Sequence, residues 1–174
     1  MQRRLVMTLA MSIDGFIADE EGGYAWIKGD GNHQLDTPNK WDFDAFLNQV
    51  DTVIMGNTCY QERMHLDYQN KTVFIASSSP HEDHDNLRFI SGDICSIVRE
   101  ELKKPGKDIF LFGGGKLVDQ FIKADMIDEY IIGIIPVILG RGRPLFYHNS
   151  PVLTFTLTEY MVDEGIVILR YRRR

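Results

Sequence analysis

The sequence contains few cysteines and no long apolar run. Cys59 and Cys95 are its 2 cysteines, too few for a disulfide framework or for a zinc site built from cysteine. The N-terminal run Leu5–Ser12 is too short to cross a membrane and lacks the small-residue cleavage site of a signal peptide. We therefore expect a protein of the reducing cytoplasm, without a membrane partner.

The chain also has no excess of positive charge. Lys and Arg total 19 against 25 Asp and Glu, which gives a formal net charge of −6. A protein that binds the phosphate backbone of nucleic acid needs the opposite sign, so we expect no nucleic-acid partner. The basic C-terminus is the exception, and we expect it to end a strand in solvent. It carries Arg170, Arg172, Arg173 and Arg174.

What is present is the composition of a globular protein. The chain has 174 residues, of which 44% are hydrophobic and 25% are charged. This length and balance predict one domain over residues 1–174 with a sizeable core.

Strand and helix patterns alternate through the first two thirds of the chain. Short apolar runs bounded by turn residues predict strands at 5–11, 51–56, 71–76, 87–90 and 108–112. Helical spacing predicts helices at 93–104 and 116–123, and Thr37-Pro38 predicts the start of another that carries Trp41 and Phe46. Residues 19–33 are rich in Gly, Asp and Glu, which predicts a mobile loop.

The last third has a different pattern. Residues 129–139 form one long β-rich segment, and residues 152–162 and 166–171 predict a hairpin around Glu164-Gly165. Repeated βα units followed by a C-terminal β-hairpin predict a three-layer α/β fold. We expect a mixed, mostly parallel central sheet with helices on both faces and antiparallel strands at one edge.

Three of the predicted strands end in small or polar residues. The tips are Gly56-Asn57-Thr58, Ser77-Ser78-Ser79 and Gly113-Gly114-Gly115. In open α/β sheets the ligand crevice lies beyond the carboxyl ends of the strands, so these tips should converge. Their backbone N–H groups and the helix N-termini after them favour a phosphate-bearing ligand, although glycines also serve to close tight turns. The common nucleotide motifs do not fit, because a Walker A loop needs glycine at Phe110 and a Rossmann fingerprint needs it at Val118.

Four segments carry a resemblance to a known family. They are residues 11–18 (MSIDGFIA), 53–58 (VIMGNT), 110–117 (FLFGGGKL) and the stretch from 127 to 146. In this order, over nearly the whole chain, they resemble the dihydrofolate reductase-like superfamily, and most closely its branch with the reductase domain of riboflavin biosynthesis. The resemblance implies a dihydrofolate reductase-like fold and a reduced nicotinamide dinucleotide as hydride donor.

The resemblance also implies which residues bind this cofactor. Ala10 and Ile17 would flank the nicotinamide, and Ser77 and Ser78 would lie by the adenine ribose. The phosphates would be met by two groups of residues: Gly56, Asn57, Thr58 and Cys59 on the adenosine side, and Gly113, Gly114, Gly115, Lys116, Leu117 and Gln120 at the pyrophosphate. Family members carry a cis peptide at the glycine run, so we expect one between Gly113 and Gly114.

Positions 57 and 59 depart from the family pattern. Members commonly have Arg and Thr where this chain has Asn57 and Cys59. An arginine can grip the 2′-phosphate of NADPH with two hydrogen bonds, whereas asparagine carries no charge. We therefore expect NADPH, with NADH as the alternative unless Lys116, Arg63 or another cation substitutes.

The substrate side is less defined. In dihydrofolate reductases a carboxylate on the first long helix binds the pterin, and Asp42 and Asp44 occupy that neighbourhood. They are candidate catalytic residues, or else solvated charges beside a core that contains Trp41 and Phe46. Trp26 is a candidate aromatic lid over the nicotinamide.

Three further segments each have two interpretations. Asp14 contacts the ligand or caps the turn before Gly15. Arg141 and Arg143 hold a substrate phosphate or are solvated. Residues 81–85 (HEDHD) contain metal-ligand types, but a flexible polar loop has the same composition, and we expect no metal.

Two classes of function follow. The first is an NAD(P)H-dependent reductase of a small heterocyclic substrate, in the narrow case 5-amino-6-(5-phosphoribosylamino)uracil. The second is a nucleotide-binding module without turnover. The zinc-ligand motifs of a deaminase are missing, so the chain is at most the reductase half of a bifunctional riboflavin enzyme. The segment 130–135 is too apolar for an exposed edge strand. Relatives in the riboflavin branch pair through this region, so the resemblance implies a homodimer.

Overall fold

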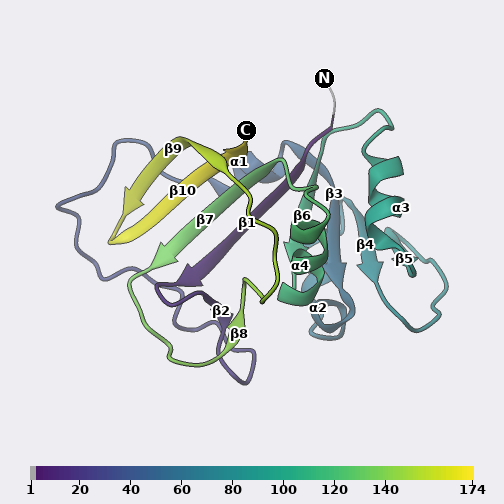
Figure 1. Ribbon diagram of the computed structural model, residues 1–174, viewed down its shortest axis with the longest axis horizontal. Coiled ribbons are helices and arrows are strands. Elements are labelled where there is room, and N and C mark those ends of the chain that lie inside the picture. The colour runs from purple at the N-terminus through teal and green to yellow at the C-terminus, as the bar shows by residue number, and fades with distance from the viewer. Residues whose placement is uncertain (1–2) are drawn as a thin grey trace.

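One large sheet organises the computed structural model, which describes residues 3–174 (Figure 1). Its strands are β1 Leu5–Ser12, β3 Val50–Gly56, β4 Thr72–Ala76, β5 Leu87–Ile90, β6 Asp108–Gly113, β7 Glu129–Ile135, β9 Phe155–Asp163 and β10 Ile166–Arg173. These 8 strands lie in the order β5-β4-β3-β6-β1-β7-β10-β9.

The sheet is parallel over most of its width. β1 pairs in parallel with β6 and β7, β3 with β4 and β6, and β4 with β5. β7 then pairs antiparallel with β10, and β10 with β9. The hairpin turns at Glu164 and Gly165, which both have positive φ. This confirms the predicted mixed sheet with an antiparallel edge.

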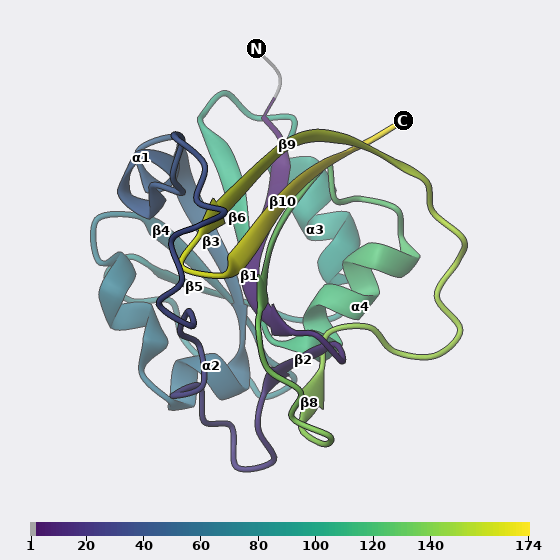
Figure 2. The ribbon, with the colours of Figure 1, turned by 90° about the vertical axis from the view of Figure 1, so that its left-hand side faces the viewer.

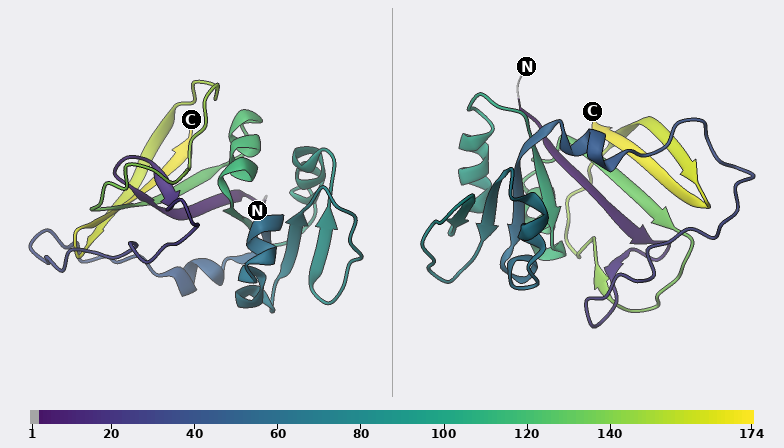
Figure 3. Two further views of the ribbon diagram at one scale, coloured as in Figure 1. Left: turned by 90° about the horizontal axis from the view of Figure 1, so that it is seen from below. Right: turned by 180° about the vertical axis from the view of Figure 1, so that it is seen from behind.

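Helices cover both faces of the sheet, as predicted (Figure 3). They are α1 Phe43–Leu47, α2 Asn57–Gln61, the 3-10 helix η1 Met64–Tyr68, α3 Ile94–Glu101 and α4 Gly115–Lys123. One core lies under α3 and α4, where Val98 and Phe121 are buried. The other lies under α1, α2 and η1, where Phe46, Cys59 and Tyr68 are buried. No helix within residues 3–174 has the length and apolarity to span a membrane.

The first helix is shorter than the sequence predicts. α1 begins after Asp42, whose carboxylate accepts a 2.8 Å hydrogen bond from the N–H of Ala45. Thr37 does not cap a helix. Its N–H donates to the carbonyl of Val162 at 3.0 Å, and its hydroxyl accepts from the N–H of Val162 at 2.9 Å. Pairing with β9 therefore overrides the local capping signal.

The long segment from residue 19 to residue 42 is anchored to the C-terminal hairpin. Figure 2 shows it passing over the turn between β9 and β10. The N–H of Asp30 donates to the carbonyl of Glu164 at 2.8 Å, and Lys40 Nζ lies 2.6 Å from Asp163 Oδ1. Hydrogen bonds far apart in sequence thus hold the Gly-rich loop that the sequence predicts as mobile.

A second, small sheet was not predicted. It pairs β2 Phe16–Ala18 with β8 Arg143–Pro144. Asp14 supports it, because its carboxylate accepts hydrogen bonds from the Ser12 hydroxyl at 2.6 Å and from the N–H of Gly140 at 2.7 Å. These bonds lower the pKa of Asp14. Asp14 therefore caps the turn and ties it to the loop after β7, which ends at Ile135 and not at the predicted residue 139.

β7 lies inside the sheet, between β1 and β10. Tyr130, Ile131 and Ile135 are buried by neighbours within the chain. The segment is thus not an exposed edge, in agreement with its apolar sequence, and the expected homodimer stays a prediction.

The arginines of β10 pair with carboxylates. Arg170 and Arg172 each reach Glu129, a carboxylate that is 2% exposed, at 3.3 and 3.2 Å. Arg4 reaches the same carboxylate at 3.1 Å, and Arg173 lies 3.3 Å from Asp128. Arg172 and Arg173 are exposed at the end of β10, as the sequence predicts, and acids of the segment 128–129 pair with them there.

Candidate active site

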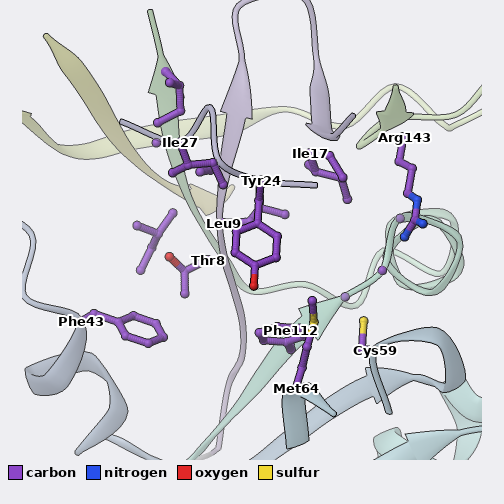
Figure 4. Close-up of a pocket in the computed structure, with 18 of the residues that line it drawn as sticks. Thr8, Leu9, Ile17, Tyr24, Ile27, Phe43, Cys59, Met64, Phe112 and Arg143 are labelled. Carbon is purple, nitrogen blue, oxygen red and sulfur yellow. The ribbon is translucent and has the colours of Figure 1, made fainter. Parts of the chain in front are cut away.

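A cavity of about 580 Å³ opens on the face of the sheet that carries α1 and α2. Its floor is formed by inward-facing residues of β1, β7 and β10, including Ala10, Gly133 and Ile168. The walls come from α1, α2, η1 and the loop after β2. Figure 4 shows the cavity with Tyr24 near its centre.

One end of the cavity is a run of bare backbone at the tip of β6. The peptide between Gly113 and Gly114 is cis, as expected. A Cβ built on either glycine would meet nothing within 4 Å, so both face open space. Met55 of β3 is in register with Gly113, and a Cβ on Gly56 would lie 3.7 Å from the Gly114 nitrogen. The tips of β3 and β6 therefore lie side by side.

Helix α4 starts directly after this run. It has 9 residues, and no side chain caps its N-terminus at Gly114. The first N–H groups of a helix have no partner within the helix, and its dipole places partial positive charge there. This end of the cavity, which we call the glycine end (Gly113–Gly115), therefore suits an anion such as a phosphate.

Arg143 adds a positive charge at the glycine end. It lines the cavity from β8, and its Nη1 lies 3.6 Å from Glu62 Oε1. It packs on Gly22, where a Cβ would lie 2.4 Å from the guanidinium. Cys59 lies nearby in Figure 4. Burial raises the pKa of its thiol, which keeps the thiol neutral.

The opposite end of the cavity is aromatic and apolar. Figure 4 places Phe43 and Ile27 on the side away from Arg143. Trp41 and Phe43 line this end, and Thr8 contributes a hydroxyl. Phe43 and Ile27 are 39% and 40% exposed, so both leave apolar surface free within the cavity. We call this the aromatic end (Thr8, Ile27, Trp41 and Phe43).

The structure brings some of the predicted cofactor residues to the cavity. Those that line it are Ala10, Ile17, Cys59, Gly113, Gly114 and Gly115. Those that do not are Gly56, Asn57, Thr58, Ser77, Ser78, Lys116, Leu117 and Gln120.

Three of the non-lining positions have clear local roles. Leu117 is buried in the core under α4, because it lies on the apolar side of that helix. The Ser77 hydroxyl bonds with the backbone of Ser79. Asn57 is the first residue of α2 and follows Gly56 at the shared tip.

The catalytic candidates do not line the cavity. Asp42 is the N-cap of α1, and Asp44 is exposed in its first turn. The residue between them, Phe43, faces the cavity instead. Trp26 donates from Nε1 to the carbonyl of Gly23 at 3.2 Å, while Tyr24 from the same loop lines the cavity. The segments that carry Asp42, Asp44 and Trp26 therefore reach the cavity through Phe43 and Tyr24, and a catalytic role of the three candidates stays a prediction.

Several lining residues escaped the sequence analysis as site residues. They are Thr8, Tyr24, Ile27, Trp41, Phe43, Glu62, Met64, Asp67 and Phe112. Large apolar residues inside a polar, Gly-rich loop were a usable signal for Tyr24 and Ile27. No local signal marks Glu62 or Asp67.

The histidines of residues 81–85 take part in ring packing. His81 and His84 stack on Phe89 with centroid distances of 4.6 and 5.8 Å. Among the described residues, no group of three or more His, Cys, Asp or Glu side chains is placed to hold a metal ion.

The sheet order, the bare glycine tip and the cleft beside β1 define a dihydrofolate reductase-like protein. The chain belongs to the family of the RibD C-terminal domain, whose family model matches residues 61–168. It is 36% identical over 155 residues to the uncharacterized protein YwjB of Bacillus subtilis, with 84% of each chain covered. The resemblance to the riboflavin-biosynthesis branch is thus confirmed.

Solved structures agree with this assignment. A protein of Shewanella sp. PV-4, assigned by its name to riboflavin biosynthesis, matches with a TM-score of 0.81 and 28% identity over 98% of this chain and 99% of its own. Dihydrofolate reductase of Enterococcus faecalis, solved with NADP(H) and RAB-propyl, matches with a TM-score of 0.67 and 17% identity. The match covers 99% of this chain and 97% of the reductase. The second likeness shows the shared fold.

Proposed function

We propose that the protein is an NAD(P)H-dependent reductase that transfers a hydride to a small heterocyclic substrate. The observation that carries this proposal is the joining of two unlike environments in one cavity. The glycine end offers bare backbone and a helix N-terminus, and the aromatic end offers rings and aliphatic side chains. A dinucleotide with its substrate has the same polarity, with charged phosphates at one end and flat rings at the other.

The residues present fit a dinucleotide. The open space over Gly113 and Gly114 would let phosphate oxygens approach the backbone, and the uncapped α4 would donate N–H groups to them. Ala10 and Ile17 would flank the nicotinamide, which supplies the hydride when the cofactor is bound. Tyr24 stands over the middle of the cavity and would help to exclude water.

Arg143 supports a preference for NADPH in this proposal. The family pattern has arginine at position 57, which is Asn57 here, and Arg143 brings a guanidinium to the glycine end from another element. A guanidinium binds a phosphate with paired, charge-assisted hydrogen bonds. We therefore propose NADPH as the cofactor, with a weaker preference over NADH than in relatives that carry arginine at 57.

Replacing Arg143 tests the cofactor site. Arg143→Gln should weaken NADPH binding roughly ten- to a hundredfold, because one charge-assisted contact contributes about 1.5–3 kcal/mol. Arg141→Gln is the matched control, since Arg141 is 79% exposed, pairs with Glu20 and does not line the cavity. Dissociation constants come from nucleotide fluorescence at fixed ionic strength. Equal effects of both substitutions would show that Arg143 does not contact the bound cofactor.

Turnover separates the enzyme from a binding module. Oxidation of NADPH by candidate heterocyclic acceptors is followed at the reduced nicotinamide absorbance. Binding of NADPH without oxidation by any acceptor would favour the module, and oxidation only with 5-amino-6-(5-phosphoribosylamino)uracil would favour the riboflavin step.

We further propose a cytoplasmic homodimer. Cys59 and Cys95 are both free thiols, which suits a reducing compartment. β9 is an edge strand on which Leu157 and Tyr160 are 48% and 61% exposed, a surface that a second copy would cover. Light scattering should give twice the chain mass of 20.0 kDa, and the monomer mass at micromolar concentration would contradict the dimer.

A further inference from the structure

Two opposite charges meet beside the glycine end of the cavity. Arg143 of β8 and Glu62, the C-cap residue of α2, both line the cavity, and Arg143 Nη1 lies 3.6 Å from Glu62 Oε1. Their side chains are 43% and 37% exposed. An ion pair this open to water contributes little free energy, so a ligand can separate the two side chains easily.

The backbone around Arg143 fixes the place of its guanidinium. Arg143 pairs with Ala18 in the small sheet. A Cβ on the preceding residue, Gly142, would lie 2.2 Å from the Ala18 carbonyl oxygen, so β8 can approach β2 only with glycine there. A Cβ on Gly22 would lie 2.4 Å from the guanidinium and would displace it. The chain thus leaves room for this cation at the cavity wall.

Glu62 is held on the facing wall. Its N–H donates to the carbonyl of Thr58 at 2.9 Å, and Arg63, with a φ of 63°, turns the chain from α2 into η1. Both charges also act on Cys59, which lies on the same side of the cavity as Arg143 in Figure 4. Burial raises the pKa of the Cys59 thiol most, Glu62 raises it further, and Arg143 lowers it. The carboxylate and the guanidinium therefore lie near the same lining side chain.

The charges give Glu62 opposite effects on the two dinucleotides. Within residues 3–174, Arg143 is the only cation that lines the cavity. Under the proposed function it binds the 2′-phosphate of NADPH, and a carboxylate beside it repels that phosphate. NADH has a hydroxyl in place of the phosphate, and a carboxylate accepts hydrogen bonds from ribose hydroxyls in dinucleotide sites. The same side chain thus disfavours NADPH and favours NADH.

We infer that Glu62 sets the selectivity between NADPH and NADH by opposing Arg143. The inference rests on the proposed reductase function and deepens it, because Arg143 supplies the preference for NADPH and Glu62 limits it. Specificity of this kind combines an attractive group for one ligand with a repulsive group against it. A residue that only oriented Arg143 would act in the other direction, since its loss would weaken NADPH binding.

Glu62→Gln tests the inference, because it removes the charge and keeps the shape. It should tighten NADPH binding and leave NADH no tighter, so the ratio of the NADH to the NADPH dissociation constant should rise about tenfold. Glu20→Gln is the matched control, since Glu20 pairs with Arg141 at 3.0 Å and does not line the cavity. Both constants come from nucleotide fluorescence at fixed ionic strength. A rise of less than about threefold, weaker NADPH binding, or an equal rise in the control would overturn the inference.

A calorimetric titration with inorganic pyrophosphate keeps two failures apart. If both dinucleotides bind and their ratio does not rise in Glu62→Gln, the proposed cofactor stands and the role of Glu62 is wrong. If neither dinucleotide binds, the proposed cofactor is wrong and pyrophosphate decides on Glu62. Binding that is tighter in Glu62→Gln and unchanged in Glu20→Gln would then support its opposition to an anion beside Arg143, and no gain would refute it.

Discussion

The glycine end makes a sharp prediction at Gly114. Its backbone angles, φ −80° and ψ −173°, are ordinary for a residue with a side chain, and a Cβ there would meet nothing within 4 Å. Gly114→Val should therefore fold with little loss of stability. The added methyl groups would, however, fill the space in which a phosphate meets the backbone.

The magnitude follows from the contacts that would be lost. A phosphate at the start of α4 would take at least two N–H donors, at about 1.5–3 kcal/mol for each charge-assisted bond. Loss of both costs about 3–6 kcal/mol, which raises the dissociation constant of NADPH roughly a hundredfold to ten-thousandfold.

The neighbouring glycine provides the contrast. A Cβ on Gly115 would lie 2.6 Å from the Pro144 carbonyl oxygen and 3.2 Å from the Tyr147 ring. Gly115→Ala should thus lower the free energy of unfolding by about 1–3 kcal/mol through overpacking. Both variants are assayed by thermal melting and by NADPH fluorescence titration. The reasoning fails if Gly114→Val binds NADPH as the parent does, or if it unfolds while Gly115→Ala stays stable.

Three other perturbations test separate parts of the structure. Asn57→Arg should tighten NADPH binding and leave NADH unchanged in paired titrations, and equal tightening of both would show that position 57 does not face the 2′-phosphate. Burial raises the pKa of Tyr68 to about 12. The fold therefore favours the neutral phenol, so stability is complete below the unfolded pKa of about 10 and falls as pH rises towards 12; Tyr68→Phe should remove this fall in urea unfolding. Glu129→Ala should cost about 3 kcal/mol, because it leaves three arginines without their shared carboxylate, whereas the exposed Glu100→Ala should cost less than about 0.5 kcal/mol in the same measurement.

The fold could be predicted because its strands carry local signals. The apolar runs at 51–56, 71–76 and 108–112 lie in the parallel interior, where both faces of a strand are buried and the pattern is unambiguous. The first helix and the small sheet could not be predicted in the same way. Thr37 pairs with β9, and β2 pairs with β8 across more than a hundred residues. A short stretch of sequence therefore does not predict either contact.

The two ends of the site differ in how far the sequence predicts them, and the reason is the same. The glycine end is formed by the tips of strands, and parallel strands bring their tips to the same edge of the sheet. Gly113, Gly114 and Gly115 could therefore be predicted as site residues from the sequence. The aromatic end is set by a segment that the hairpin holds through Asp30 and Thr37. Which side chains of that segment face inward depends on these distant contacts and on the start of helix α1, where Phe43 lines the cavity and Asp42 and Asp44 do not.

Under the proposed function, Arg143 is a residue that transfer from a family pattern leaves out. A bound phosphate needs a cation at a certain place beside it, and residues from different positions in the chain can supply that cation. At the glycine end, the strand tip at 57 and the short strand β8 lie within reach of the same region, because Gly56 adjoins Gly114 and the Pro144 carbonyl lies against Gly115. A chain with Asn57 can therefore supply the guanidinium from β8. Under the proposed function, Asn57→Arg combined with Arg143→Gln should bind NADPH about as tightly as the parent, since one cation replaces the other. A double variant as weak as Arg143→Gln alone would show that the two positions serve different phosphates.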